Sequence, residues 1–300
     1  MPTSIYERED LQDEGLILIH ENKGAAPGDK KIRLVRDPWV SLVPWGNCAG
    51  VMAVFVQVSF SPLNGFYHGD DEHSVRDDAS FPVYTVKEIV QKIRNKQPAI
   101  VYLCGGDPMF KWDDETRHLV LALEKEEPNV PVIIDTSGVV FPDSFQNILE
   151  EPTEEDPLED FVPNNIVEII VRPQVIGMPV PEGEVGGYFQ WLPDVLKKWL
   201  MFGVYWTRVN FVFEISEPNL VADIAQVIAF LQDLYEDEND GMLLNFDKQV
   251  IVFTLKDGDE YTDEEYMAYC KDLANTVGKM LLNLPNAAVT VQPNHSYLMG

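Results

Sequence analysis

The chain has 300 residues and a mass of 34.0 kDa, and 45% of its residues are hydrophobic, enough for one large core or two medium ones. Its 50 acidic and 22 basic residues give a net charge of −28, the opposite sign to that of a protein that coats nucleic acid or an anionic membrane. The three widely spaced cysteines form neither a disulfide framework nor a CxxC metal pair, and the N-terminus lacks a secretory signal pattern. We expect a cytoplasmic protein without direct nucleic-acid or membrane binding.

Hydrophobic periodicity predicts alternating strands and helices from residue 53 onward. Strands are expected at 53–60, 98–104, 131–135, 166–172, 208–216, 249–255 and 287–292, and helices at 85–96, 112–127, 191–202, 218–235 and 262–282. Thr85 and Glu88 have the spacing of a capping box at the start of the first helix. Repeated β–α units require a parallel sheet with helical crossovers, so the fold class is α/β, as an open or closed barrel.

Composition divides the chain into an extension and one domain. Residues 1–37 precede the first β–α unit and carry a basic patch of Lys30, Lys31, Arg33 and Arg36. Residues 38–300 are expected to form a single α/β domain. The acidic, proline-containing run at 150–160 interrupts it as a loop or insertion.

Acidic residues concentrate in three clusters, at 150–160, 233–240 and 257–265. One interpretation is that they are solvated loops that keep the protein soluble. The other is that they form an electrostatic surface for a basic protein partner, including a partner whose nucleic-acid groove they mimic. The candidate partner-binding residues are Glu154, Glu155, Asp156, Glu236, Asp237 and Glu238.

A buried strand at 98–104 leads directly into a GGDP segment formed by Gly105, Gly106, Asp107 and Pro108. Two glycines let the backbone approach a ligand closely, and the acid can take a ligand amine. The alternative is a tight strand-to-helix turn without a ligand. A second polar run, HGDDEH at 68–73, could hold a divalent cation, but we expect a polar surface loop and no metal.

Four segments in order carry a family resemblance. GGDP resembles the GGEP element of radical S-adenosylmethionine (SAM) enzymes, and three further segments resemble the 7-carboxy-7-deazaguanine synthases: SLVPWGNCAGVMAVFVQV at 41–58, IIDTSG at 133–138 and AVTVQPNHSYL at 288–298. The resemblance covers most of 38–300 and implies a partial (β/α) barrel and, by analogy, a homodimer. It also implies a vestigial ligand site of Gly105, Gly106, Asp107, Pro108, Thr136, Ser137 and Gln292.

The sequence differs from this family at the positions that bind the family's cluster and substrate. The resemblance places the CxxxCxxC motif, which holds an iron–sulfur cluster, at SPLNGFYHGD, where Ser61, Gly65 and His68 stand in place of cysteine. Serine and glycine cannot replace thiolates on such a cluster. The substrate-side Glu and Arg of the family are Trp45 and Gln57 here. We therefore expect no cofactor.

These observations favour a catalytically inactive scaffold whose acidic surface binds a protein. Two alternatives remain open. One is ligand binding or cluster-free activity at the barrel mouth, through Asp107, the 136–138 turn and Gln292. The other is a structural subunit of a larger assembly, in which the acidic clusters are contacts between subunits.

Overall fold

The computed structural model describes residues 22–59, 81–126, 128–150, 163–173, 188–205, 207–215, 224, 225, 227, 229, 251–255, 263–280 and 289–291. The chain divides into two compact units. The first unit comprises 1–41, 52–136 and 140–167, and the second comprises 42–51, 137–139 and 168–300.

The first unit contains one strand that is buried along nearly its whole length. The strands of this unit are β1 (Lys31–Arg33), β2 (Trp39–Leu42, whose last residue belongs to the second unit), β3 (Met52–Val58), β4 (Val83–Thr85), β5 (Val101–Gly105) and β6 (Val132–Thr136). Strand β5 lies between β3 and β6, parallel to both, with Val101 opposite Val54 and Val132. Tyr102 and Leu103 are each only 1% exposed, as expected of a parallel strand covered on both faces.

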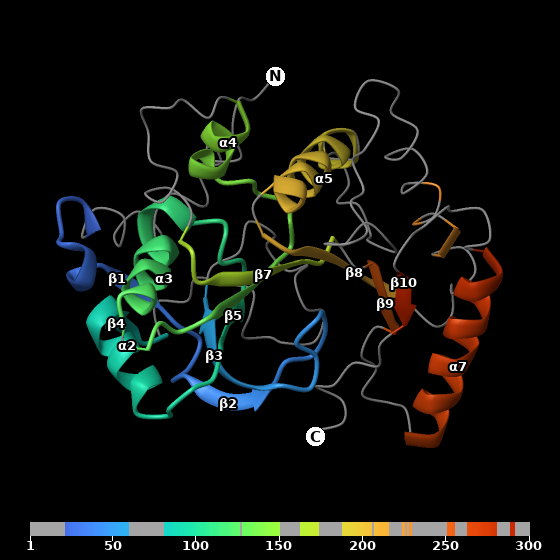
Figure 1. Cartoon of the computed structure of the whole chain (residues 1–300), viewed down its shortest axis with the longest axis horizontal. Helices are drawn as coiled ribbons and strands as arrows, with labels where there is room; N and C mark the ends of the chain where they lie inside the picture. The colour runs from blue at the N-terminus through green and yellow to red at the C-terminus, as the bar shows by residue number, and fades with distance from the viewer. Residues whose placement is uncertain are drawn as a thin grey trace. The chain divides into compact units, whose positions relative to one another are not determined.

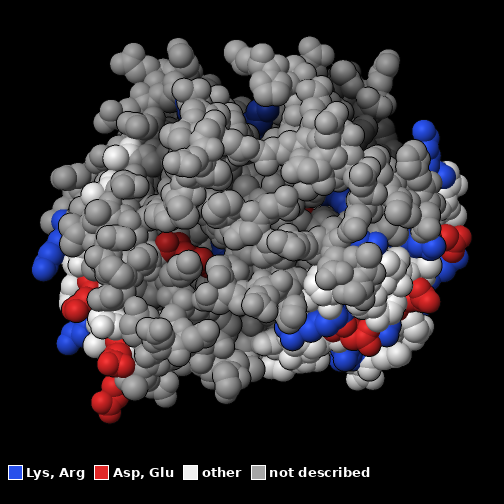
Figure 2. Space-filling view, turned by 180° about the vertical axis from the view of Figure 1, so that it is seen from behind, with Lys and Arg blue, Asp and Glu red and all other residues white. Residues whose placement is uncertain are grey.

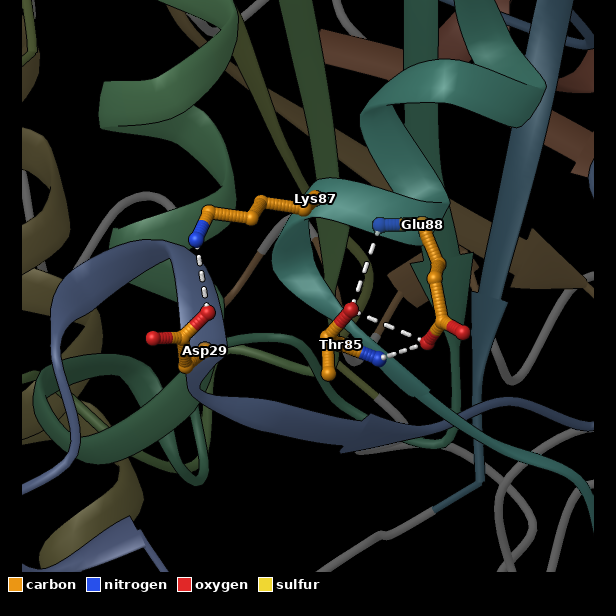
Figure 3. Close-up of polar contacts among 4 residues, drawn as sticks. All are labelled: Asp29, Thr85, Lys87 and Glu88. Atoms are coloured by element: carbon orange, nitrogen blue, oxygen red, sulfur yellow. Dashed lines mark hydrogen bonds and ion pairs between the residues drawn. The ribbon is translucent and has the colours of Figure 1, made fainter.

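Short helices complete the first unit: η3 (Pro27–Asp29), α2 (Val86–Arg94), the π-helical turn η4 (Trp112–Thr116), α3 (Arg117–Glu124) and α4 (Asp143–Glu150). Helix α2 begins with the capping box that the sequence predicts. Glu88 N donates to Thr85 Oγ1 at 3.3 Å and Thr85 N donates to Glu88 Oε2 at 2.7 Å (Figure 3). Its apolar stripe buries Ile89 and Ile93.

Strands β1 and β4 form a separate two-stranded antiparallel sheet, with Ile32 opposite Tyr84. Ile32 and Leu34 have no exposed surface. Part of the segment expected as an extension is therefore built into the first unit, beside α2 and α3 (Figure 1).

The second unit contains a parallel set of strands: β7 (Ile166–Val171, which enters from the first unit), β8 (Val209–Ile215), β9 (Ile251–Leu255) and β10 (Val289–Val291). Its described helices include α5 (Tyr188–Tyr205) and α7 (Asp263–Met280), of which α7 lies along β9 and β10. Helix α7 buries Tyr266, Leu273 and Val277.

The two faces of this sheet differ in chemistry, because paired residues of parallel strands share a face. One face is apolar and carries Ile169, Val171, Phe211 and Phe213. The other, which we call the polar face, carries Glu168, Arg172, Asn210, Glu214 and Thr254.

The sequence predicts every strand from β5 onward and β3 to within about three residues at either end. The helix expected at 112–127 is instead a π-helical turn followed by α3, and α5 begins three residues earlier than expected. Strands β1, β2 and β4 and helix α4 were not predicted, and most of the helix expected at 218–235 lies outside the described residues. Among the helices described, none is long and apolar enough to cross a bilayer.

Candidate functional site

The GGDP segment begins where β5 comes unusually close to β3. Gly105 has φ +118°. A Cβ there would collide with the carbonyl oxygen of Val58 and would lie 2.7 Å from the backbone nitrogen of Val58. Gly106 N donates to the same carbonyl oxygen at 3.0 Å. Glycine at 105 is therefore required by the strand pairing itself, which favours the tight-turn interpretation of this segment.

Asp107 points into the protein. It has no exposed surface, and its Oδ1 accepts hydrogen bonds from Met109 N at 3.0 Å and from Thr136 Oγ1 at 2.7 Å. The carbonyl oxygen of Pro108 accepts from Thr116 Oγ1 at 2.6 Å. The aspartate thus closes its own turn and ties the end of β5 to the end of β6.

The DTSG element also has internal partners. Tyr102 donates from its hydroxyl to Asp135 Oδ2 at 2.6 Å, and both side chains are buried. In the second unit, Ser137 Oγ accepts from Val139 N at 3.4 Å, and Trp199 Nε1 donates to the carbonyl oxygen of Gly138 at 3.2 Å. Each of these polar groups therefore forms a hydrogen bond within the protein.

The first unit thus brings together five of the predicted site residues: Gly105, Gly106, Asp107, Pro108 and Thr136. Ser137 follows directly in the chain and belongs to the second unit. The other predicted site residues lie outside the described residues: Ser61, Gly65, His68, Glu154, Glu155, Asp156, Glu236, Asp237, Glu238 and Gln292.

Sequence analysis missed a buried carboxylate in the second unit. Glu168 is 1% exposed, and its Oε1 accepts from Asn47 N at 2.9 Å and from Asn210 Nδ2. A Cβ at Gly46, which has φ +82°, would collide with Oε1, so the 46–48 turn fits closely over the carboxylate. Burial raises the pKa of Glu168, although these N–H donors act in the opposite direction.

A buried cation lies on the same polar face. Arg172 Nη1 lies 2.9 Å from Glu214 Oε1, and the guanidinium is 5.1 Å from the centroid of the Trp45 ring. Burial, followed by the charge of Glu168, raises the pKa of the neighbouring Cys48 thiol. The pattern IVEIIVR could have revealed this face, because a charge inside a buried apolar strand needs partners.

Three further atoms of the polar face and its covering turn are buried and, among the residues described, have no hydrogen-bond partner: Trp45 Nε1, Glu168 Oε2 and Thr254 Oγ1. Buried polar atoms of this kind call for a partner, such as water or a ligand. The described part of the chain holds no group of three or more His, Cys, Asp or Glu residues placed to bind a metal ion.

No protein-family model and no curated protein matches the sequence. The fold does match that of a solved structure, QueE from Escherichia coli, a radical SAM 7-carboxy-7-deazaguanine synthase. The likeness covers 95% of this chain and 99% of QueE, with a TM-score of 0.52 and 13% sequence identity. The fold is therefore α/β, with the parallel strands and helical crossovers of the partial (β/α) barrel of that class.

The residues at the family's ligand positions do not fit the cofactors that the fold implies. Asp107, which the resemblance places where an acid meets the amino group of SAM, is fully buried and hydrogen-bonded inside its own turn. The three described cysteines lie on separate elements, in the 46–48 turn, β5 and α7. We derive no reaction step through an iron–sulfur cluster or SAM.

Proposed function

We propose that this protein is a catalytically inactive member of the radical SAM fold class that acts by binding a protein partner with a basic surface. The observation that carries the first part is the burial of Asp107, whose carboxylate accepts from Met109 N and Thr136 Oγ1. Since the carboxylate has no exposed surface, a ligand amine could reach it only if the residues around its turn moved.

The cluster loop supports the same proposal. At the three positions that the resemblance assigns to cysteine, the chain has Ser61, Gly65 and His68. Without thiolates the loop has no ligand set for a 4Fe–4S cluster, and the radical chemistry of the family has no electron source.

Charge supports the partner-binding part. Residues 151–300 contain 26 of the 50 acidic residues and only 8 of the 22 basic ones. Such a field steers basic partners and repels acidic ones. Proteins that hold nucleic acid in a basic groove are one such partner class.

Anaerobic reconstitution with iron and sulfide tests the loss of activity. We expect no bound iron in the wild-type protein, whereas about four irons per chain would contradict the proposal. A variant with Ser61→Cys, Gly65→Cys and His68→Cys is the control that shows whether the loop can otherwise accept a cluster. A second assay, calorimetry with SAM, should show no heat of binding, and a dissociation constant at or below about 10 μM, or about −7 kcal/mol, would contradict the proposal.

A second candidate function, ligand binding without a cluster, is favoured by the unpartnered atoms of the polar face, Trp45 Nε1, Glu168 Oε2 and Thr254 Oγ1. They suit a small polar molecule that both donates and accepts hydrogen bonds. Mass spectrometry of the denatured protein should then detect a small molecule that Thr254→Val lacks. Without a ligand, Thr254→Val should be neutral or stabilising, because it removes a buried unpaired hydroxyl.

A further inference from the structure

The first unit carries a basic surface in an otherwise strongly acidic protein. Segments 22–37 and 83–97 together contain nine basic and three acidic residues, whereas the whole chain has a net charge of −28. We call this surface the basic face. Its basic residues are Lys23, Lys30, Lys31, Arg36, Lys87, Lys92, Arg94 and Lys96, whereas Arg33, the ninth, is only 7% exposed.

The fold gathers the two segments, which are about fifty residues apart in the chain. Strand β1 pairs with β4, and α2 follows β4 directly. The ammonium group of Lys87 reaches across to Asp29 Oδ1 at 2.7 Å (Figure 3). Figure 2 shows lysine and arginine side chains of described residues along the right-hand edge of the molecule, with aspartate and glutamate side chains among them.

The acids within the basic face are already engaged. Asp29 pairs with Lys87, and Asp37 lies 3.0 Å from Lys92 Nζ while accepting from the hydroxyl of Tyr84 at 2.5 Å. Glu88 is held in the capping box by Thr85. Each of the three thus has a partner within the face, and the charge of Lys96 also acts on Asp37.

Four cations of the face have no carboxylate within ion-pair distance among the described residues. Lys23 and Lys96 are exposed, and Arg36 is exposed with its guanidinium 3.6 Å above the Trp39 ring. The half-buried Lys30 donates only to the carbonyl oxygen of Asn22, at 2.6 Å. Val40 and Val83 are 46% and 39% exposed and offer apolar contact.

We propose that the basic face binds a short acidic polypeptide segment of a protein partner, a second interaction site that is independent of the acidic clusters. Carboxylates of the segment pair with Lys23, Arg36 and Lys96, while its apolar side chains lie on Val40 and Val83. Charge complementarity sets the register of such a contact and rejects basic segments.

The charge of the whole chain favours a peptide over nucleic acid. A nucleic-acid duplex carries one negative charge per about 1.7 Å, and the chain's net charge of −28 repels so dense a polyanion. A short acidic segment can lie within the face, where the repulsion from more distant carboxylates is screened beyond about 8 Å at physiological salt.

The test uses the full chain and a labelled acidic peptide that is not part of this sequence, DEVLEDLDEE, with its neutral counterpart NQVLQNLNQQ and a single-stranded oligothymidine of equal charge as controls. Fluorescence anisotropy should show binding of the acidic peptide only, weakened by raising the salt concentration. The variant Lys23→Glu with Lys96→Glu should weaken that binding by about tenfold or more, because it places like charges opposite the peptide. The matched variant Lys271→Glu with Lys279→Glu, on exposed positions of α7, should change it by less than about twofold.

Three results would overturn the proposal: no binding of the acidic peptide, equal loss of binding in the α7 variant, or equally tight binding of the oligothymidine. Circular dichroism shows that each variant is folded. The charge-removing variant Arg36→Gln provides a second measurement and should weaken binding in the same direction by a smaller factor. Because no acidic-cluster residue is changed, these results are independent of the proposed function.

Discussion

Gly105 shows how a single residue fixes the end of a central strand. Its φ of +118° and the closeness of Val58 leave no room for a side chain. We expect Gly105→Ala to lower the free energy of unfolding by about 2–4 kcal/mol, because backbone strain adds to a collision with backbone atoms. Urea denaturation followed by circular dichroism measures the change.

Gly24→Ala is the matched control. Gly24 has φ +79°, but no atom lies within 4 Å of the position that a Cβ would take there, so substitution carries the backbone strain alone. It should cost about 1 kcal/mol. Equal losses in the two variants would show that the contact with Val58 contributes nothing.

Glu168 should make the second unit sensitive to pH. Burial raises its folded-state pKa above the unfolded value, so the folded protein holds the proton more tightly. The stability that this provides is present in full below the unfolded pKa and is lost as the pH rises through the folded pKa. Glu168→Gln should remove this part of the pH dependence, measured as the difference in unfolding free energy between the two proteins from pH 4 upward.

Glu88 provides a control, because its pKa is shifted in the opposite direction from that of Glu168. Hydrogen bonds from the backbone and hydroxyl of Thr85 lower its pKa. Its contribution is therefore present above the unfolded pKa and is lost as the pH falls through the folded pKa. Glu88→Gln should flatten the acid side of the profile; a change of the same sign as that of Glu168→Gln would contradict the assignment.

At the scale of an element, helix α2 depends on its first residue. The hydroxyl oxygen of Thr85 accepts a hydrogen bond from Glu88 N, and the carboxylate of Glu88 accepts one from Thr85 N. Thr85→Ala should reduce the unfolding free energy by about 1 kcal/mol, since it leaves an N–H at the helix start unpaired. Thr85→Ser keeps the hydroxyl and should cost less than half as much in the same urea titration.

The elements that sequence analysis predicted are those whose burial pattern is continuous. Strands β5 and β8 are buried over nearly their whole length, as parallel strands covered on both faces are, and α2 shows both a cap and an apolar stripe. Strands β1 and β4 are three residues each, too short for any periodicity, and exist because they pair with each other. Local pattern cannot show a pairing between segments that are fifty residues apart.

The candidate site was predictable in position but not in orientation. The sequence located Gly105–Pro108 at the end of a strand and Thr136 at the end of the next, and the structure brings them together. That the Asp107 carboxylate points inward depends on Thr136 and Met109, which no motif specifies. Glu168 was missed for the same reason, because its partners come from the 46–48 turn and from β8.

Over the whole molecule, charge is the property that the fold does not explain. Exposed carboxylates contribute little to stability, and a large excess of one sign slightly opposes compaction through self-repulsion. A net charge of −28 is consistent with both interpretations of the acidic clusters, solubility and the proposed binding of a basic partner. The basic face shows that the charge is unevenly distributed, because segments 22–37 and 83–97 hold nine of the 22 basic residues and only three of the 50 acidic ones.

The proposed basic partner should therefore associate by a salt-sensitive route. Neutralising one acidic cluster, with Glu154→Gln, Glu155→Gln and Asp156→Asn, should slow association by about tenfold or less and leave dissociation nearly unchanged, because exposed charges act mainly by steering. Surface plasmon resonance at low and at physiological salt measures both rates, and the difference between variant and wild type should shrink as the Debye length falls to about 8 Å. Asp107→Asn is the control and should leave association unchanged, since that carboxylate is buried. The reverse pattern, in which Asp107→Asn abolishes binding and the triple variant has no effect, would place the function at the strand ends of the first unit and leave the acidic clusters with solubility alone.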